Sequence, residues 1–258
     1  MNVHPTAVID PRAWLASTVT IGPYCVIGEN VALGDDCELM SHGVIDGHTQ
    51  VGSGNRFFPF VSIGCAPQDL KYRGELTRVE IGSDNVFREF VTVHRGTVGG
   101  GGVTRIGNRN LLMAYVHVAH DCTLGDDVIM ANGATLSGHV EVQDKAIIGA
   151  FSAIHQFCRV GAHSFLGGYS VVTRDLLPYS KTSAPRPLGV YGANHLGLER
   201  RGFSKEEIAE LQAAFRLLCR AKLNTTQALA AIEARHFQSE QVRALVDFIK
   251  SSKRGVVK

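Results

Sequence analysis

A six-residue period runs through this chain and limits what it can fold into. An apolar residue occupies every sixth position over Val3–Ile63, over Ile81–Val93 and again over Ile106–Val172. Only 45% of all residues are hydrophobic, so an unbroken apolar column of this length does not arise from composition alone. Small side chains recur four residues after the apolar position. Glycine, asparagine, aspartate and histidine fill the places between, where a chain turns most easily.

A short strand and a turn every six residues predict a parallel β-helix. In the hexapeptide class the coil is left-handed and triangular, with three hexads per coil; these properties belong to the repeat class and not to the spacing itself. Cys25, Cys37, Cys122 and Cys158 fall in the small column. We expect them to be buried free thiols in a reducing compartment.

The predicted fold class is mainly β, a left-handed parallel β-helix of hexapeptide repeats with a C-terminal α-helical domain. The β-helix is expected over residues 1–190, with loop excursions at 64–80 and 95–105, where binding loops tend to lie. The glycine run 99–102 is interpreted as a flexible loop tip, and 178–190 as an irregular linker. Residues 191–258 are predicted to form the helical domain. Its helices begin near Ser204, which forms a capping box with Glu207, near Asn224 and near Ser239.

Composition excludes several classes of function. The formal net charge of +2 is too close to neutral to predict binding of nucleic acid. The sequence holds neither a long apolar span nor a signal-peptide core, so we expect a cytoplasmic protein without membrane insertion.

Stacking predicts where the polar residues of the turns converge. With three hexads per coil, residues eighteen apart lie one strand spacing, about 4.8 Å, from each other. One edge of the prism should therefore collect His117, His120, Asp121, Gly138, His139, His155 and Gln156. The same place in the hexad also holds Asp36, His42, His48, Asp84 and Asp127, so a single such residue is more often a turn residue than a site. The convergence of seven residues within two coils predicts a functional site.

The chemistry of this set is that of acyl transfer. A neutral imidazole beside a carboxylate is a general base, because the carboxylate fixes the tautomer and the orientation of the ring. Gly138, one coil from His120, offers an unshielded N–H for a developing oxyanion. Because the set has no serine or cysteine nucleophile, we expect direct transfer to a hydroxyl or amine of the acceptor.

Two other functional classes are alternatives to acyl transfer. Some hexapeptide β-helices bind zinc through three histidines and hydrate carbon dioxide, but that family spaces its last two ligands H-x4-H, whereas His117 and His120 are H-x2-H. A scaffold without chemistry does not account for the convergence. No metal ion is therefore expected.

Several motifs carry a resemblance to a known family. The segments "HVAHDCTLG", "SGHV", "IHQFC", "QDLKY", "VHRGT" and "GLERRGFS" are similar to those of the UDP-N-acetylglucosamine O-acyltransferases of lipid A biosynthesis, a hexapeptide-repeat acyltransferase family. The resemblance runs nearly end to end. It implies transfer of a 3-hydroxyacyl chain from acyl carrier protein to the sugar 3-hydroxyl, the first step of lipid A biosynthesis, by a homotrimer with its active sites between neighbouring prisms. It implies no cofactor, because the acyl group arrives on the phosphopantetheine arm of the carrier.

The resemblance also implies roles for individual residues. His120 would be the general base, Asp121 would orient it and Gly138 would supply the oxyanion N–H. Asp69, Lys71, His139 and Gln156 would hold the sugar, with Gln68 and His155 close by. The nucleotide would be held by His117, Asn194, Arg200 and Arg201. Gly168 would limit the length of the acyl chain, and an open glycine there implies a long one of the 3-hydroxymyristoyl class.

One relative with different chemistry stays open as an alternative. The N-acyltransferase of the same pathway has an additional N-terminal domain, whereas this chain enters the repeat at Val3, and its motif has asparagine where this chain has Asp121. The sequence does not distinguish an acceptor sugar with a 3-hydroxyl from one with a 3-amino group.

Overall fold

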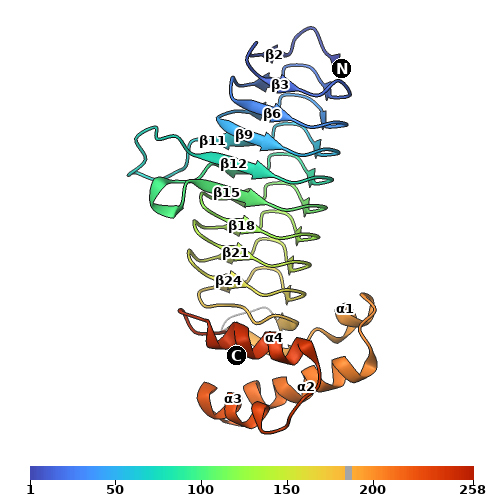
Figure 1. Ribbon diagram of the computed structural model, residues 1–258, viewed down its shortest axis with the longest axis vertical. Coiled ribbons are helices and arrows are strands. Elements are labelled where there is room, and N and C mark those ends of the chain that lie inside the picture. The colour runs from blue at the N-terminus through green and yellow to red at the C-terminus, as the bar shows by residue number, and fades with distance from the viewer. Residues whose placement is uncertain (184–187) are drawn as a thin grey trace.

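The structure is a computed structural model that describes residues 1–183 and 188–258. It shows a triangular prism of short parallel strands, with helices packed at the C-terminal end (Figure 1). The front strands run from left to right while the chain descends, which makes the coil left-handed (Figure 1). The predicted fold class is confirmed.

Three sheets form the faces of the prism, and each takes every third strand of the repeat. Sheet A contains β1 Asn2–Val3, β4 Thr20–Ile21, β7 Glu38–Leu39, β10 Arg56–Phe57, β13 Val86–Phe87, β16 Leu111–Leu112, β19 Ile129–Met130, β22 Ile147–Ile148, β25 Phe165–Leu166, β27 Ser180–Ser183 and β28 Gly189–Ala193. Sheet B contains β2 Val8–Ile9, β5 Val26–Ile27, β8 Val44–Ile45, β11 Ser62–Cys65, β14 Thr92–His94, β17 His117–Val118, β20 Thr135–Leu136, β23 Ala153–Ile154 and β26 Val171–Val172. Sheet C contains β3 Trp14–Leu15, β6 Val31–Leu33, β9 His48–Val51, β12 Arg78–Ile81, β15 Val103–Ile106, β18 Thr123–Leu124, β21 Glu141–Val142 and β24 Arg159–Val160.

The apolar column forms the core of the prism. From Ile21 to Val172, every residue of the column is buried. The register is the predicted one: His117 pairs with Thr135, and Thr135 pairs with Ala153, each eighteen residues further on. The four cysteines of the small column are buried and free, as predicted.

Three edges join the sheets, and we name them by the sheets they connect: the AB, BC and CA edges. Most turns from Tyr24 onward place one residue in the left-handed region, such as Tyr115 at the AB edge (φ 63°), Asp121 at the BC edge (φ 60°) and Asp127 at the CA edge (φ 57°). Glycine, asparagine and aspartate adopt this conformation most readily. The turn composition of the sequence thus follows from the geometry of the corners.

Both excursions leave the prism at the BC edge and project from the same side (Figure 1). The first spans residues 66–77 and the second residues 95–102, because β11 extends to Cys65, β12 begins at Arg78 and β15 begins at Val103. They are shorter than predicted, since backbone pairing between β12 and β15 begins before the apolar column resumes.

The helical region contains α1 His195–Glu199, α2 Lys205–Cys219, α3 Thr225–Glu233 and α4 Glu240–Lys250. Ser204, Asn224 and Ser239 are the N-caps of α2, α3 and α4, and the predicted box between Ser204 and Glu207 forms. The described part of the chain includes no helix long and apolar enough to cross a membrane.

The predicted irregular linker is partly wrong. β27 continues sheet A by pairing Lys181 with Phe165, and it pairs with β28 in an antiparallel hairpin. The sequence pattern does not reveal this pairing, because it rests on backbone hydrogen bonds and not on a spaced apolar column. β28 also crosses the boundary expected at residue 190. Residues 184–187 of the predicted linker lie outside the described residues.

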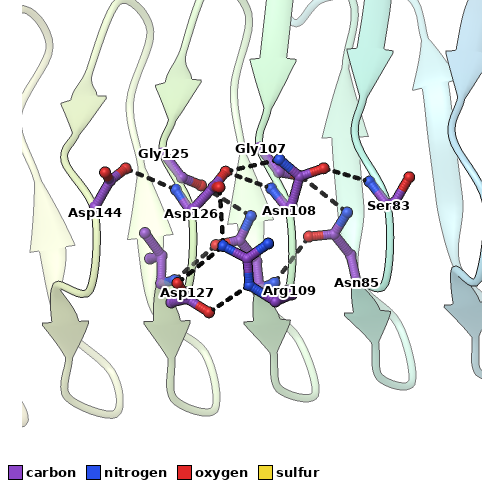
Figure 2. A network of polar contacts seen from close by, with 11 residues as sticks. Ser83, Asn85, Gly107, Asn108, Arg109, Gly125, Asp126, Asp127 and Asp144 are labelled. Carbon is purple, nitrogen blue, oxygen red and sulfur yellow. Dashed lines mark hydrogen bonds and ion pairs between the residues drawn. The ribbon is translucent and has the colours of Figure 1, made fainter. Parts of the chain in front are cut away.

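The CA edge is closed by hydrogen bonds between successive turns (Figure 2). The N–H of Asn108 donates to Asp126 Oδ1 at 2.8 Å, and the N–H of Asp126 donates to Asp144 Oδ1 at 2.8 Å. Arg109 donates to Asp126 Oδ2 at 3.0 Å and to Asp127 Oδ1 at 2.9 Å. Inside the prism, Asn85 accepts from the N–H of Asn110 at 2.8 Å. Polar turn residues at this edge therefore satisfy one another.

Candidate active site

The BC edge brings the predicted catalytic residues together. His120 and Asp121 follow β17, and Gly138 and His139 follow β20 one coil further on. His120 lies over Gly138, and the N–H of His139 donates to the carbonyl of His120 at 3.1 Å. The stacking expected from the eighteen-residue spacing is confirmed.

His120 and Asp121 form a direct pair. His120 Nδ1 lies 2.8 Å from Asp121 Oδ2, and the Asp121 side chain is fully buried whereas that of His120 is 16% exposed. A carboxylate accepts only, so Nδ1 carries the hydrogen and Nε2 is left with a free lone pair. The pair thus presents a basic nitrogen to the outside of the prism.

Thr97 of the second excursion holds the Asp121 carboxylate from the other side. Its N–H donates to Oδ1 at 2.9 Å and its hydroxyl donates to Oδ2 at 2.6 Å. These two bonds and that of His120 leave the carboxylate little freedom to rotate. Sequence reasoning missed Thr97, because the excursion has no period that would place it against the turn after β17.

Part of the glycine run, interpreted as a flexible loop tip, has regular structure and a close contact with the BC edge. Val98–Gly100 forms a turn of 3-10 helix over the BC edge. A Cβ placed on Gly100 would lie 2.0 Å from Asp121 Cγ, so only glycine allows the loop to close over the carboxylate. The loop therefore shields Asp121 from solvent.

Gly138 allows the base and a backbone donor to come close together. A Cβ at this position would lie 2.6 Å from Cε1 and 2.8 Å from Nε2 of His120. Within the described residues, the N–H of Gly138 has no acceptor. The residue that lies against the basic nitrogen thus has a backbone N–H that is available to an oxyanion.

The first excursion closes a cleft beside His139. The cleft has a volume of about 300 Å³ and is lined by Asp69, Lys71, Tyr72, Glu75, Thr97, Val98, Gly99, His139 and Phe157. Asp69 Oδ1 accepts from the N–H of Lys71 at 2.9 Å. His139 stacks on Phe157 with ring centroids 4.4 Å apart. Burial lowers the pKa of His139, against the opposing effect of Asp121 and Asp69. Charged and aromatic groups thus surround a space large enough for part of a sugar.

A second pair of histidines, His94 of β14 and His117 of β17, precedes His120 in the chain. His117 Nδ1 lies 2.7 Å from Thr92 Oγ1, and its ring meets that of His94 edge to face at 5.0 Å. Burial lowers the pKa of His94 to about 4, with His117 and His120 adding to the effect. Burial also lowers the pKa of His117. His94 was missed as a site residue, although it stands in the "VHRGT" motif.

His155 and Gln156 lie one coil beyond Gly138 on the BC edge, and both are exposed. Gln68 is exposed on the first excursion. Arg254, from the C-terminal tail, reaches His155 with Nη2 3.3 Å from Nδ1. No sequence pattern connected this arginine with the edge.

The tail residues predicted to hold a nucleotide lie at another edge of the same chain. Asn194 donates to the carbonyl of His163 at 3.3 Å, and Arg201 Nη1 lies 3.2 Å from His163 Nδ1 at the CA edge. Arg200 is exposed at the end of α1. Gly168 follows β25 at the AB edge. One chain therefore does not bring these residues to His120.

The geometry offers one group that resembles a metal site. Single ligand atoms of His120, Asp121 and His139 lie within 4.8 Å of one another. However, Asp121 Oδ2 already accepts from Thr97 and from His120, and His139 Nε2 lies 3.9 Å from it. The donor set fits a hydrogen-bonded base better than a cation.

Comparisons with known proteins identify the family of the chain. Residues 175–257 match the family model "Udp N-acetylglucosamine O-acyltransferase; Domain 2", and residues 104–138 match "Bacterial transferase hexapeptide (six repeats)". The chain is 48% identical over 255 residues to an acyl-[acyl-carrier-protein]--UDP-N-acetylglucosamine O-acyltransferase of Thermodesulfovibrio yellowstonii, covering 99% of this chain and 98% of the relative. It is also 48% identical to the enzyme of that name from Thiobacillus denitrificans, covering 100% of this chain and 99% of the relative. The crystal structure of the UDP-N-acetylglucosamine O-acyltransferase of Moraxella catarrhalis superposes with a TM-score of 0.94 at 43% identity and covers 100% of both chains.

Proposed function

The chain belongs to the UDP-N-acetylglucosamine O-acyltransferase family, and we propose that the His120–Asp121 pair with Gly138 is its catalytic centre. The enzyme transfers an acyl chain from acyl carrier protein to UDP-N-acetylglucosamine, the first step of lipid A biosynthesis. The observation that carries the proposal is the free Nε2 of His120 beside the unpaired N–H of Gly138.

The proposed reaction proceeds in two proton transfers. His120 Nε2 removes the proton of the sugar 3-hydroxyl while that oxygen attacks the thioester carbonyl of a 3-hydroxyacyl group. The carbonyl oxygen becomes an oxyanion that accepts from the N–H of Gly138. The carbon–sulfur bond then breaks, and the leaving thiolate of the phosphopantetheine arm takes the proton back from His120. Asp121 stabilises the imidazolium between the two steps.

The cleft beside the first excursion is proposed as the sugar site. Asp69, Lys71 and His139 line it, and Gln156 lies beyond Gly138 on the same edge, with Gln68 and His155 as outer neighbours. An amide and a carboxylate suit sugar hydroxyls, because they can accept and orient several hydrogen bonds.

A homotrimer is proposed, because one chain leaves its nucleotide residues away from its base. His117 lies at the BC edge, whereas Asn194, Arg200 and Arg201 belong to the helical region, with Asn194 and Arg201 at the CA edge. A neighbouring copy is needed to bring such residues to His120. Arginine suits a diphosphate, since its fork bonds two oxygens.

An uncovered aromatic stripe along the AB edge supports self-association. It contains Tyr24, Phe60, Phe90, Tyr115, Phe151 and Tyr169, which are 41% to 71% exposed. Neighbouring rings stack at 5.0 Å between Phe60 and Phe90 and at 4.8 Å between Phe90 and Tyr115. Contiguous exposed aromatic surface of this kind marks protein interfaces.

The six free cysteines are consistent with the proposed cytoplasmic location.

Co-expression of two defective chains tests the shared site. His120→Ala and Arg201→Ala chains, each with its own affinity tag, are purified together through both tags. If copies share sites, the mixed trimer regains activity that neither variant has alone. An inactive mixed trimer with the mass of three chains would contradict the sharing of Arg201.

Gly168 is proposed as the position that limits acyl length. A Cβ there would lie 3.1 Å from the carbonyl oxygen of Ala150, so a larger side chain has to project away from the backbone, toward the space proposed for the acyl chain. We expect Gly168→Met to move the optimum to shorter chains, because each methylene that loses its buried place costs about 0.8 kcal/mol. The ratio of kcat/KM for short and long 3-hydroxyacyl carriers measures the change. An unaltered ratio would remove Gly168 from this role.

The assignment of substrate and chemistry is tested by product analysis. The protein is incubated with UDP-N-acetylglucosamine, or with its 3-amino analogue, and a series of 3-hydroxyacyl carrier proteins. A product of acylated mass that mild base cleaves is an ester, whereas a stable product is an amide. Exclusive turnover of the 3-amino analogue would favour N-acylation, the alternative chemistry. Loss of activity with EDTA and its recovery with zinc would contradict the metal-free mechanism.

A further inference from the structure

The C-terminal tail returns to the BC edge and is fixed there. After α4, the N–H of Asp175 donates to the carbonyl of Gly255 at 2.9 Å, and the N–H of Val257 donates to the carbonyl of Asp175 at 2.9 Å. Asp175 is itself buried in an ion pair with Arg159 at 3.0 Å. The tail is thus anchored immediately after Arg254, next to the last coils of the prism.

Arg254 lies between a buried thiol and an exposed imidazole. Burial raises the pKa of the Cys158 thiol, and the Arg254 guanidinium beside it acts in the opposite direction. Its Nε is buried and has no hydrogen-bond partner among the described residues. Its Nη2 lies 3.3 Å from Nδ1 of His155, a residue 99 positions away in the chain. The guanidinium therefore contacts both the Cys158 sulfur and His155 Nδ1, and the imidazole nitrogen is the stronger acceptor of the two.

His155 Nδ1 has two neighbours that make opposite demands. The carbonyl oxygen of Gln156 lies 3.2 Å away and can only accept, whereas Arg254 Nη2 lies 3.3 Å away and can only donate. If Nδ1 carries the hydrogen, it bonds Gln156 and leaves the arginine unpaired. If Nδ1 is bare, it accepts from Arg254 and the hydrogen resides on Nε2.

We infer that Arg254 is a positioning residue that holds His155 in the Nε2–H tautomer, so that the imidazole presents a hydrogen-bond donor along the BC edge. The bond to Arg254 is favoured over the bond to Gln156, because a hydrogen bond with a charged partner is stronger than one between neutral groups, and the exposed carbonyl can bond water instead. Resting on the proposed function, this donor faces a carbonyl oxygen of the acyl donor, either of the acyl group or of the phosphopantetheine amides. Without Arg254, the hydrogen resides on Nδ1, and Nε2 presents a hydrogen-bond acceptor along the BC edge.

Nitrogen NMR reads the tautomer without reference to activity. The full chain is labelled with 15N-histidine and measured near pH 8.5, about two units above the usual histidine pKa. The His155 signals are identified by their loss in His155→Gln. We expect a bare Nδ1 and a protonated Nε2 in the unaltered protein and in Arg254→Lys, which keeps a cationic donor. We expect the reverse in Arg254→Met, which keeps the length of the side chain.

Kinetics then tell whether the tautomer matters to the reaction. Arg254→Met should lower kcat/KM for acyl carrier substrate about fivefold, mainly through KM, because one neutral hydrogen bond is worth about 1 kcal/mol. Arg254→Lys should restore most of it. Arg243→Met is the matched control, since Arg243 is an exposed arginine of α4 whose described contacts, with Glu240 and with the carbonyl of Gln238, lie at the surface.

The outcomes separate this inference from the catalytic proposal. A protonated Nδ1 in the unaltered protein, or an unchanged tautomer in Arg254→Met, would overturn the inference whatever the activity. Signals of the other histidines report whether Arg254→Met keeps its fold. If it does not, Arg254→Lys remains as the test, because a protonated His155 Nδ1 in that variant would overturn the inference. An active His120→Ala variant would overturn the catalytic proposal and leave the tautomer result standing.

Discussion

At the CA edge, the N–H groups of Asn108 and Asp126 donate to the carboxylate of the next coil. At the BC edge, Gly138 occupies the same slot of its hexad, and its N–H has no acceptor within the described residues. Asp127 and Asp121 likewise share a slot and a left-handed conformation. Asp127 bonds an exposed arginine, whereas Asp121 is fully buried and bonds a histidine that faces outward.

The comparison teaches how a repeat acquires a site. Both edges use the polar residue types that a left-handed turn accepts, so residue type alone does not distinguish them. The CA edge uses its donors and acceptors to bind coil to coil. The BC edge leaves a base and a donor unpaired at one level, and the two excursions close over them. Unpaired polar groups that a fold could have satisfied indicate binding or catalysis.

The largest expected effect follows from removing the base. His120→Ala should lower kcat by roughly 10²–10⁴-fold, the usual contribution of a general base. The fold should persist, because the imidazole makes its hydrogen bond only to Asp121. Steady-state kinetics with a thermal unfolding curve measure both. Asn108→Ala is the matched change at the CA edge and should keep its activity; near-normal turnover of a folded His120→Ala would remove the residue from the mechanism.

The opposite result is expected inside the CA edge. Asn85 is completely buried, donates to Asn55 Oδ1 at 2.9 Å and to the Gly107 carbonyl at 2.9 Å, and accepts from Asn110. Asn85→Ala leaves buried partners unsatisfied, so it should cost about 3 kcal/mol of unfolding free energy. kcat should stay unchanged in the folded fraction. Urea unfolding measures the loss, and a stability within experimental error of the unaltered chain would contradict the structural role of this edge.

A smaller effect on catalysis is expected for Asp121→Asn. The imidazole stays, but it loses the charged partner that orients it and stabilises its protonated form, so kcat should fall roughly 10–100-fold. Asp127→Asn makes the same chemical change in the same slot of the next hexad. It should leave kcat unaltered, because its carboxylate bonds only Arg109 among the hydrogen-bond partners described. Equal losses in the two variants would show that the edges do not differ in function.

The smallest expected effect is on how the unfolding free energy depends on pH, and it can be measured at both edges. Burial lowers the pKa of His94, near the BC edge, and of His163, at the CA edge, to about 4 in each case. Because the folded-state pKa lies below the unfolded value of about 6.5, the unfolded chain binds more protons between these values. Their contribution to stability is complete above pH 6.5 and is lost as the pH falls toward 4. Each should contribute a slope of about 1 kcal/mol per pH unit in that window.

Single His94→Gln and His163→Gln variants should each flatten this slope in urea unfolding measured between pH 7 and pH 4.5. A double variant should flatten it by the sum, because the residues lie at different edges and have different partners. Slopes that match the unaltered chain would mean that these histidines are protonated in the folded protein as readily as in the unfolded one.

The periodic part of the chain could be predicted closely from the sequence. The apolar column, the convergence of His120, Gly138 and His139, and the capping box of Ser204 rest on spacings that the backbone geometry dictates. The same spacing predicted the position of Asp121 but not its contact with Thr97. Thr97 approaches it from an excursion without a period, and the required closeness is visible only in the contact of Gly100 with the carboxylate.

Contacts between distant segments were beyond sequence reasoning. The hairpin of β27 and β28 rests on backbone bonds that any residue except proline can make. Arg254 contacts His155 because the tail pairs with Asp175, and neither segment has a sequence pattern that predicts this contact. Asn194 and Arg201 were predicted as ligand residues from a motif, and the motif does not tell at which edge of the chain they lie.

The register of the coils also sets the unit in which such a molecule can change during evolution. Each coil pairs only with the coil before and after it, so duplication or loss of eighteen residues leaves every other pairing intact. Such an event between Gly138 and the helical region would shift the two apart or together by one strand spacing, about 4.8 Å. The distance between the site and the helical region can therefore change in discrete steps without redesign of the chemistry.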